Sequence, residues 1–526
     1  MNQFTSKYAQ SLQGVLSGFD RLVFHGTLRT LSSVGGMKGY LSYCNILLKD
    51  FADHAEQATE RIKKAALLPF ASAHRPVHYL ASAKVSKEET AKQIAIEDEI
   101  REGPICMLTS LEVCSGFDVS FNHTAQKLQV VGRPRKCLHL YHYRMDPVFG
   151  FMHARLQTWF PFNLQICLNG REWLAHQMDQ EGLRYERRDN CFVWLEDPLR
   201  AQALLDAQLR ADWPQQLDRI KTLLNPVLEE VLAPFVSRYY WTCHASEWAT
   251  DLLFADGAFL KRMYPRWVRH GMTALASPDV LRFLGKPLSQ RGDVPAAFLG
   301  EITSDMKRRQ EGTRIKHRCN HNFLKAYDKA YTPRGNVLRV EATLNNPADF
   351  KVFRPKEGDP DGELTWRPLR KGVADLHRRA QVSQRANDRY LDALASVDTT
   401  ETLQELTDQI ARPTTWKEKR VRGINPFAGE DAALLEAVSR GEFALNGLRN
   451  RDLQRLLFTT EAASPQETRR RSGQVTRKLR MLRAHGILTK VAHTHRYQVT
   501  DAGRKILTAI LTARQTPVSE LLAKAA

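Results

Sequence analysis

Neither paired cysteines nor long apolar runs occur in this sequence. The 526-residue chain has eight cysteines, none in a CxxC pair. They are Cys44, Cys106, Cys114, Cys137, Cys167, Cys191, Cys243 and Cys319. Such scattered cysteines are typical of buried, reduced thiols and not of a disulfide framework. No stretch approaches the roughly 18 apolar residues of a membrane-spanning helix, and the polar N-terminal segment lacks the apolar core of a signal peptide. We therefore expect a cytoplasmic, bacterial protein without a membrane partner.

Internal repeats and low-complexity tracts are also missing. With 43% hydrophobic and 26% charged residues, the composition is that of an ordinary globular protein, and the length predicts about three or four domains. Alternating short strand-like and helix-like stretches predict an α+β multidomain protein with mixed or antiparallel sheets, helices and a C-terminal winged helix-turn-helix. The expected parts are an N-terminal α+β region (1–232), a helical segment with a β-meander (233–398), a linker (399–425) and the winged helix-turn-helix (426–526). The sequence assigns no role to 1–232.

Acidic residues are too few to balance the charge in the last two-fifths of the chain. The formal net charge is +19. We count 20 Lys and Arg against 12 Asp and Glu over 301–390, and 22 against 10 over 412–526. These two stretches therefore carry +20 between them, and the remainder is close to neutral. Such localised charge predicts a positively charged face that neutralises the phosphates of a nucleic acid.

The C-terminal stretch has the clearest pattern of elements. Three helices are expected over 430–440, 449–458 and 467–485, the last ending at Gly486. A β-hairpin over 487–490 and 495–499 and a final helix capped by Thr500 follow. This order, with KLRMLRAHGILTKV and RYQVTDAGRKIL, resembles the MarR-like winged-helix proteins. The resemblance covers about 90 residues and implies a winged helix-turn-helix that binds duplex DNA.

The third of these helices is amphipathic. Val475, Leu479 and Leu482 form an apolar stripe for the core, which leaves the basic residues to face outward. Arginine side chains on such a helix can bind base edges and phosphates in the major groove. The expected DNA-binding residues are Arg469, Arg470, Arg471, Arg477, Lys478, Arg480, Arg483, His495 and Arg496. A winged helix used only for protein contacts or dimerisation is the alternative.

The block 300–346 holds the candidate chemical centre. Its last strand, 337–344, places Glu341 on the face opposite its apolar residues. Because hard cations bind carboxylate oxygens, Glu341 is a candidate ligand for Mg²⁺ or Mn²⁺, with Asp328 and Glu301 as partners. Tyr327, next to Asp328, is the candidate nucleophile, since a metal-assisted phenol can attack a phosphodiester. His317, Cys319 and His321 match no standard zinc finger, so zinc is not expected.

The succession YDK then LRVE resembles the replication initiators of rolling-circle plasmids and filamentous phages, and the related relaxases. The resemblance covers about 50 residues and implies an enzyme that nicks and religates single-stranded DNA, with Tyr327 as nucleophile and Glu341 as metal ligand. The His-hydrophobe-His metal motif of the other initiator class is absent, because His139 and His142 are one residue too far apart.

Other roles for these residues stay open. Glu341 can form a salt bridge with Arg339 or a neighbouring lysine, and Tyr327 can be a packed aromatic. Tyr239 and Tyr240 are rival nucleophiles. Nearby, Glu247 and Asp251 are i, i+4 acids on one face of an expected helix.

Three functions compete at this point. The first is a metal-dependent DNA nicking or strand-transfer enzyme of replication-initiator or mobile-element type, targeted to duplex DNA by the winged helix. The second is a non-catalytic transcriptional regulator, for which over 400 preceding residues are more than such a reader needs. The third is an RNA-associated or transposition-related nuclease whose 301–390 region holds RNA or a mobile-element end. The oligomeric state is not predicted.

Overall fold

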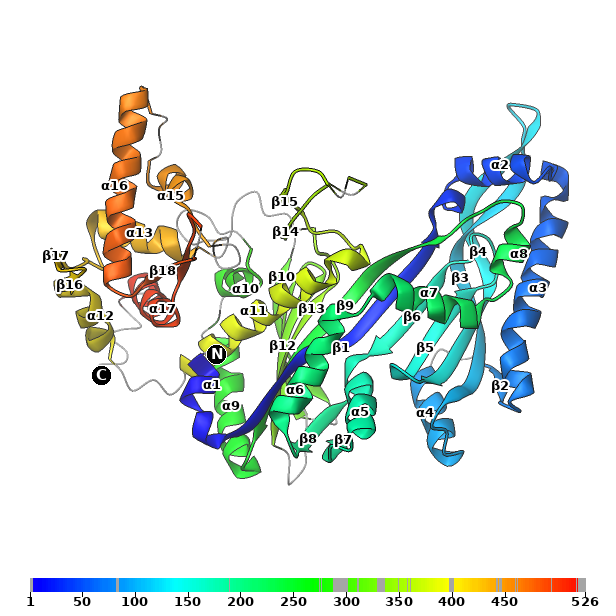
Figure 1. Cartoon of the computed structure of the whole chain (residues 1–526), viewed down its shortest axis with the longest axis horizontal. Coiled ribbons are helices and arrows are strands. Elements are labelled where there is room, and N and C mark those ends of the chain that lie inside the picture. The colour runs from blue at the N-terminus through cyan, green and yellow to red at the C-terminus, as the bar shows by residue number, and fades with distance from the viewer. Residues whose placement is uncertain are drawn as a thin grey trace. The chain divides into compact units, whose positions relative to one another are not determined.

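The computed structural model describes residues 3–518 of the chain, apart from 82–84, 189, 274, 276, 287–300, 310–311, 329–335, 349, 357, 360, 397–401, 441–442, 444–446, 459, 461, 493 and 517. It divides into two compact units, and Figure 1 labels their helices and strands. Unit 1 comprises Met1–Gln13, Phe254–Ala342 and Val382–Ala526, and unit 2 comprises Gly14–Leu253 and Thr343–Gln381. The sequence predicts a boundary near residue 232. In the structure, unit 2 extends to residue 253, and the chain comes back to this unit at residue 343. Among the described helices, none is long and apolar enough to cross a bilayer.

Unit 2 is an α+β unit built on a large sheet. Its strands are β1 (Leu12–Leu28), β2 (Val77–Tyr79), β3 (Gly103–Asn122), β4 (Lys127–Asp146), β5 (Gly150–Gln157), β6 (Leu164–Asn169), β7 (Tyr185–Arg188), β8 (Cys191–Leu195), β9 (Tyr239–Phe254), β14 (Lys351–Arg354) and β15 (Thr365–Pro368). Its α-helices are α2 (Val34–Tyr43), α3 (Phe51–Ser72), α4 (Lys87–Glu97), α5 (Gly170–Glu181), α6 (Pro198–Asp206), α7 (Trp213–Leu224) and α8 (Leu228–Leu232). The strand order in the sheet is β9-β1-β6-β5-β4-β3-β2. The neighbours β1–β6, β6–β5, β5–β4 and β4–β3 are antiparallel, and β3–β2 is parallel.

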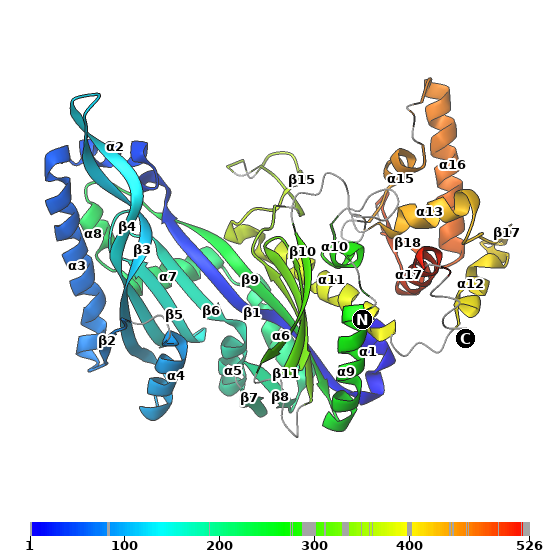
Figure 2. The same ribbon diagram turned by 180° about the vertical axis from the view of Figure 1, so that it is seen from behind.

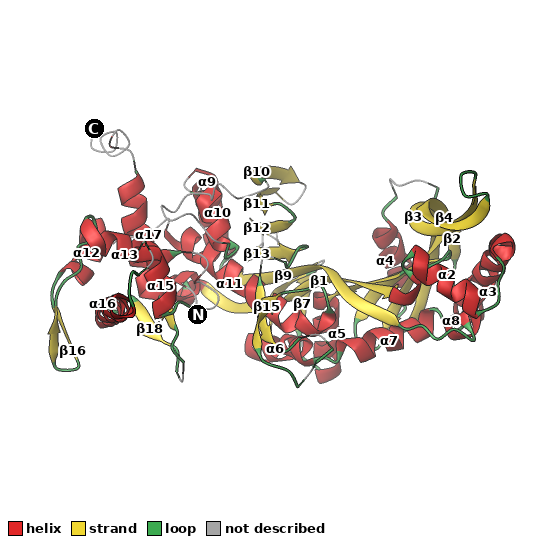
Figure 3. Cartoon of the chain, turned by 90° about the horizontal axis from the view of Figure 1, so that it is seen from above, coloured by secondary structure: helices red, strands yellow, loops and turns green. Residues whose placement is uncertain are grey.

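The two faces of this sheet differ in polarity because side chains alternate along each strand. One face is apolar, and α3 and α7 cover it: the ring of Phe24 packs on Trp213 of α7, and His142 packs on Phe70 of α3. The other face carries histidine, tyrosine, cysteine and arginine side chains along β3 to β6. Figure 3 shows α4 on the opposite side of these strands from α7. The sheet of unit 2 therefore has one packed face and one polar face.

Helix α4 illustrates how the sequence sets an element's bounds. The Ser86 hydroxyl accepts a hydrogen bond from the Glu89 N–H at 3.3 Å, as expected for an N-cap. Ala91 and Ala95 then pack on the edge of the polar face, against Tyr143 of β4. Figure 2 shows α4 beside β3, β4 and β5. The N-cap signal in the sequence therefore lies where the helix starts.

The expected helix over the start of 235–290 is wrong, because residues 239–254 form β9. Tyr239, Trp241 and Cys243 are buried, whereas Tyr240 and Thr242 between them are half-exposed. This alternation has the period of a strand, and aromatic and β-branched residues favour strands. Helices α9 (Gly257–Thr273) and α10 (Ser277–Phe283) follow in unit 1.

Unit 1 contains the predicted meander. Its strands β10 (Ile302–Arg309), β11 (Gly312–Cys319), β12 (Asn322–Asp328) and β13 (Val337–Leu344) lie in that order. The first three form consecutive antiparallel pairs. Every side chain of β13 is buried, including the polar ones. Helix α11 (Leu376–Ala395) enters unit 1 at Val382, and its Asn387 donates to the Val340 carbonyl at 3.1 Å.

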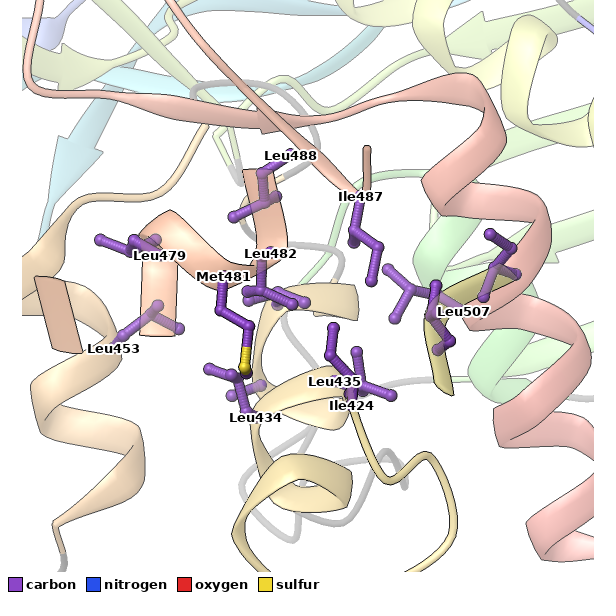
Figure 4. Close-up of a cluster of buried hydrophobic side chains, with 14 of the residues drawn as sticks. Ile424, Leu434, Leu435, Leu453, Leu479, Met481, Leu482, Ile487, Leu488 and Leu507 are labelled. Atoms are coloured by element: carbon purple, nitrogen blue, oxygen red, sulfur yellow. The ribbon is translucent and has the colours of Figure 1, made fainter. Parts of the chain in front are cut away.

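The C-terminal part of unit 1 is a module of helices and small hairpins. Its elements are α12 (Leu403–Ala411), β16 (Thr414–Trp416), β17 (Lys419–Val421), α13 (Gly429–Ser439), α15 (Asn450–Leu457), α16 (Pro465–Ala484), β18 (Leu488–Lys490), β19 (Tyr497–Val499) and α17 (Asp501–Gln515). One apolar core joins them, and Figure 4 shows Leu434, Leu479 and Leu482 meeting in it. From residue 429 on, the predicted elements are confirmed within a few residues.

The stretch 399–425, predicted as a linker, contributes to this core. Leu406, Ile410 and Ile424 are buried in it, and a capping box of Thr402 and Glu405 starts α12. The stretch was expected to be polar and only partly helical, because its apolar residues are few. Leu406 and Ile410 lie on one face of α12, and Ile424 follows β17, which is enough for docking on the core.

Candidate nucleic-acid interface

Helix α16 is bounded by clear local signals. The Ser464 hydroxyl accepts a hydrogen bond from the Glu467 N–H at 3.2 Å, and Pro465 occupies the first turn. At the other end, Gly486 has φ +71°, a left-handed conformation that glycine adopts without strain. The helix thus begins and ends close to where the sequence predicts.

Four arginines of α16 face solvent. Val475, Leu479 and Leu482 are buried in the core of the module. The exposed arginines are Arg469, Arg470, Arg477 and Arg480. Within the part of the chain that the structure describes, no ion pair is recorded for any of the four. Residues 468–500 contain no Asp or Glu and nine Lys or Arg, so the exposed side of α16 and the hairpin after it carry charge of one sign.

The other three predicted basic residues of α16 have partners within the module. The Arg471 guanidinium binds the Glu467 carboxylate, 3.0 Å from Nε to Oε1. Lys478 Nζ lies 2.8 Å from Glu430. The guanidinium of Arg483 lies 5.0 Å from the ring centroid of Trp416 in β16, a cation–π contact. These three residues therefore contact side chains of the module itself.

A third segment joins the hairpin of β18 and β19. Leu448 and Tyr497 form an antiparallel bridge, with N–H to O distances of 2.8 and 2.9 Å in the two directions. A Cβ at the preceding Gly447, which has φ +66°, would lie 2.5 Å from the Tyr497 carbonyl oxygen. Sequence reasoning missed this third segment. The glycine before the second helix was the available signal.

A second group of cations lies where this hairpin meets the start of α15. Arg496 is on the hairpin, and Arg449 and Arg451 flank the first residue of α15. Burial lowers the pKa of Arg496, and the neighbouring charges of Arg449 and Arg451 lower it further, while Asp452 opposes them. The helix start adds partial positive charge. His495, beside Arg496, is exposed.

The candidate chemical centre is more enclosed than the sequence predicts. Glu341 is only 2% exposed, and its Oε1 lies 2.6 Å from Lys325 Nζ on β12. A lysine partner was one alternative, but the pair is buried and not at the surface. His317 of β11 is paired with Leu324 and so lies on the opposite face of the meander from Lys325. Its two ring nitrogens contact Ser304 Oγ at 2.7 Å and Tyr390 OH at 3.0 Å. Both nitrogens are therefore engaged.

The three predicted metal ligands are not brought together. Glu301 precedes β10, is exposed and pairs with half-buried Arg318. Asp328 ends β12 beyond the Arg314–Tyr327 pair, at the other end of the meander. Six residues of β12 lie between these ends, about 20 Å of strand. The backbone of Tyr327 and Asp328 belongs to β12, but their side chains lie outside the described residues.

The rival residues of unit 2 are largely enclosed. Tyr239 is buried, and its hydroxyl donates to the Phe162 carbonyl at 2.6 Å. The Arg29 guanidinium lies 3.1 Å from the Tyr240 ring centroid. The Asp251 carboxylate is buried against Arg171, 2.9 Å away. A carboxylate oxygen of Glu247 lies within 4.8 Å of one of Asp20, whose oxygens accept from the Asn190 amide at 2.8 and 3.1 Å.

The spacing of His139 and His142 places them on opposite faces of β4. His142 is buried on the apolar face, and burial lowers its pKa to about 3. His139 lies on the polar face beside Cys137. The two histidines therefore cannot bind one metal ion together. Their spacing in the sequence already departs from the His-hydrophobe-His motif.

Comparisons of the chain with protein-family models, with curated protein sequences and with solved structures found no match.

Proposed function

We propose that this protein binds duplex DNA through a C-terminal winged helix-turn-helix, with α16 as the helix that enters the major groove. The order α13, α15, α16, β18, β19, α17 has the arrangement of that fold. The bridge between Leu448 and Tyr497 supports the assignment, because it adds a strand segment to the hairpin that would form the wing.

The observation that carries the proposal is the set of four exposed arginines on α16. Their guanidinium groups have no recorded acidic partner in the described part of the module, so binding phosphate breaks no ion pair. Arginine forks also bind the O6 and N7 atoms of guanine. Arg449, Arg451 and Arg496 would form a second contact, to backbone phosphates beside the groove, because these three cations outnumber Asp452 at the start of α15.

Salt dependence of binding tests this proposal. The probe is a fluorescein-labelled random-sequence duplex about three helical turns long, and its anisotropy is followed over a series of salt concentrations. Replacing Arg469, Arg470, Arg477 and Arg480 by alanine should weaken binding and lower the slope of log K against log salt by up to about 4.

The control carries the same change of charge in unit 2. Lys38, Lys49, Lys64 and Lys127 are exposed, and their replacement by alanine should leave the salt slope unchanged. If the control loses as much slope as the α16 variant, the contact is a diffuse effect of net charge. If neither slope changes, α16 is not the DNA contact.

Metal-dependent cleavage of a DNA strand is a second proposal. It is supported by Glu341 and by the resemblance of the surrounding YDK and LRVE motifs to the replication initiators. A nearly fully buried carboxylate on a central strand is costly unless it is paired, and here the pair is with Lys325. A divalent ion would have to displace the Lys325 ammonium to bind Glu341. The residues therefore fit Mg²⁺ or Mn²⁺ only after that rearrangement.

Supercoiled plasmid with Mn²⁺ or EDTA tests cleavage directly. Metal-dependent nicking that is lost in Glu341→Gln but kept in Glu229→Gln, a change at an exposed acid of unit 2, would support the enzyme. Shifted but uncut DNA with every protein would favour the non-catalytic regulator instead. Circular dichroism of each variant establishes that it is folded.

A further inference from the structure

Two cysteines and a histidine meet on the polar face of unit 2. Cys114 lies on β3, and Cys137 and His139 lie two residues apart on β4. In the β3–β4 register, Cys137 is opposite Glu112 and Arg135 is opposite Cys114, so all three side chains point to the same face. Their ligand atoms lie within 4.8 Å of one another.

The distances suit one small ion. Cys137 Sγ lies 3.9 Å from His139 Nδ1, and Cys114 Sγ lies 2.8 Å from Cys137 Sγ. In a tetrahedral zinc site with Zn–S near 2.3 Å, two sulfur ligands lie about 3.8 Å apart. The sulfur atoms would therefore separate by about 1 Å. Cys114 is partly exposed, so its side chain has room for that movement.

The ligand atoms are of the types that zinc prefers. Thiolate sulfur and neutral imidazole nitrogen are its usual protein ligands. Both cysteines would bind as thiolates, so metal binding displaces the protons of both thiols.

The two arginines next to the cluster each contact a carboxylate. Arg135 Nη1 lies 2.9 Å from Asp118, which also binds Arg133, and Arg155 lies 2.8 Å from Glu112, which also lies 3.7 Å from Lys87. The hydroxyl of Tyr141 donates to Glu112 at 2.6 Å, so this carboxylate is already engaged. Two thiolates would balance the charge of a divalent ion.

We propose that Cys114, Cys137 and His139 bind one Zn²⁺ ion, with water as the fourth ligand. Water is assigned because Cys114 is the exposed edge of the cluster and Glu112 is already bound. Binding releases the protons of the two thiols to solvent and changes no oxidation state. Three protein ligands with one solvent position are typical of zinc sites that can act on a substrate.

Cobalt titration of the reduced, full-length protein tests the site. After treatment with EDTA and a phosphine reductant, Co²⁺ should give the visible bands of a tetrahedral ion and a near-ultraviolet thiolate charge-transfer band. The bands should saturate at one ion per chain, and Zn²⁺ should remove them. Cys114→Ser, Cys137→Ser and His139→Gln should each reduce the bound cobalt at saturation to a small fraction.

A cysteine on the same strand provides the matched control. Cys106 is buried on β3 outside the cluster, so Cys106→Ser should keep the full cobalt signal. Thermal unfolding without metal shows whether each variant is folded, and the rate of thiol alkylation with and without Zn²⁺ gives a second measure of ligation. Protection of Cys114 by Zn²⁺ is expected in the wild type and in Cys106→Ser.

Two results would overturn the proposal. The first is that the reduced protein binds no cobalt and that its thiols are alkylated at the same rate with and without Zn²⁺. The other is a signal that persists in all three ligand variants. If the reduced protein binds no metal but an added disulfide oxidant links Cys114 to Cys137, the pair is a redox couple, in which two thiols give two electrons and two protons to that oxidant.

Discussion

Several arginines of the sheet region are buried, whereas four arginines of α16 are exposed. The two groups have different roles. Arg171 is fully buried against Asp251, and Arg379 donates to Ser246 Oγ and Cys243 Sγ at 3.2 Å each. On α16, by contrast, Arg477 and Arg480 extend into solvent. A buried guanidinium holds elements in place, whereas an exposed one is available to a partner. The same residue type therefore predicts function only after its burial is known.

This contrast corrects the expectation for 301–390. Its positive charge suggested a continuous face, but several of its cations are internal. The buried ones are Arg339, Arg378, Arg379 and Arg389. Arg389, for example, donates to the Phe283 carbonyl, with its Nε at 2.9 Å, and burial lowers its pKa to about 9. In the C-terminal module, by contrast, four arginines lie on the exposed side of α16.

Removing a buried arginine should have the largest effect. Arg171→Met leaves the Asp251 carboxylate without this ion pair, so we expect the free energy of unfolding to fall by about 3–5 kcal/mol. Arg480→Met, which removes the same charge from an exposed position, should change it by no more than about 0.5 kcal/mol. Urea unfolding followed by circular dichroism measures both. Equal losses would remove the distinction between the two groups.

Protonation of the buried His317 ring should have the next largest effect on the free energy of unfolding. Burial lowers the pKa of His317 to about 4 from its ordinary 6.5. The unfolded chain therefore takes up the proton first, and the stability that neutral His317 contributes is full above pH 6.5. It is lost as the pH falls toward 4, by at most about 1.4 kcal/mol per pH unit.

The measurement is the unfolding midpoint between pH 7 and pH 4. His317→Gln, which cannot titrate, should flatten this dependence while keeping the contact with either Ser304 or Tyr390. A variant whose stability falls with pH as steeply as that of the wild type would show that other groups cause the loss.

Replacing Arg496 should have the smallest effect on stability. Its burial is intermediate between that of the buried arginines and that of the exposed arginines of α16. Its charge is close to those of Arg449 and Arg451. Arg496→Gln removes this repulsion together with the attraction of Asp452, so the unfolding free energy at low salt should change by no more than about 0.5 kcal/mol. Duplex affinity should fall at the same time, with a salt slope lower by about 1. A larger loss of stability, together with a loss of affinity, would indicate a structural role.

Local signals in the sequence predicted the C-terminal module well. Ser464, Gly486 and Thr500 mark helix ends, and each acts within a few residues of itself. Strands were also predicted in unit 2, but not their length: β3 runs over 103–122, far longer than the short strand-like stretches that the sequence indicates. The ends of long strands depend on pairing with a partner, which local pattern does not encode.

The candidate sites divide in the same way. The outward position of Arg477 and Arg480 follows from helical periodicity and was predictable. The burial of Glu341, the strand at 239–254 and the cluster of Cys114 with Cys137 were not. Cys114 and Cys137 are 23 residues apart, and only the register of β3 on β4 brings their sulfur atoms together. A search for ligand spacing along the chain does not detect a site formed across strands.

The sequence by itself determined the order of elements in the C-terminal module and the side of α16 that carries its arginines, because caps, turns and helical periodicity act over a few residues. Only the tertiary structure decided which cations are buried, that residues 343–381 return to the unit of residues 14–253, and which cysteines meet. Those outcomes depend on strand pairing and packing between residues far apart in the chain, where burial sets the energy of each charge.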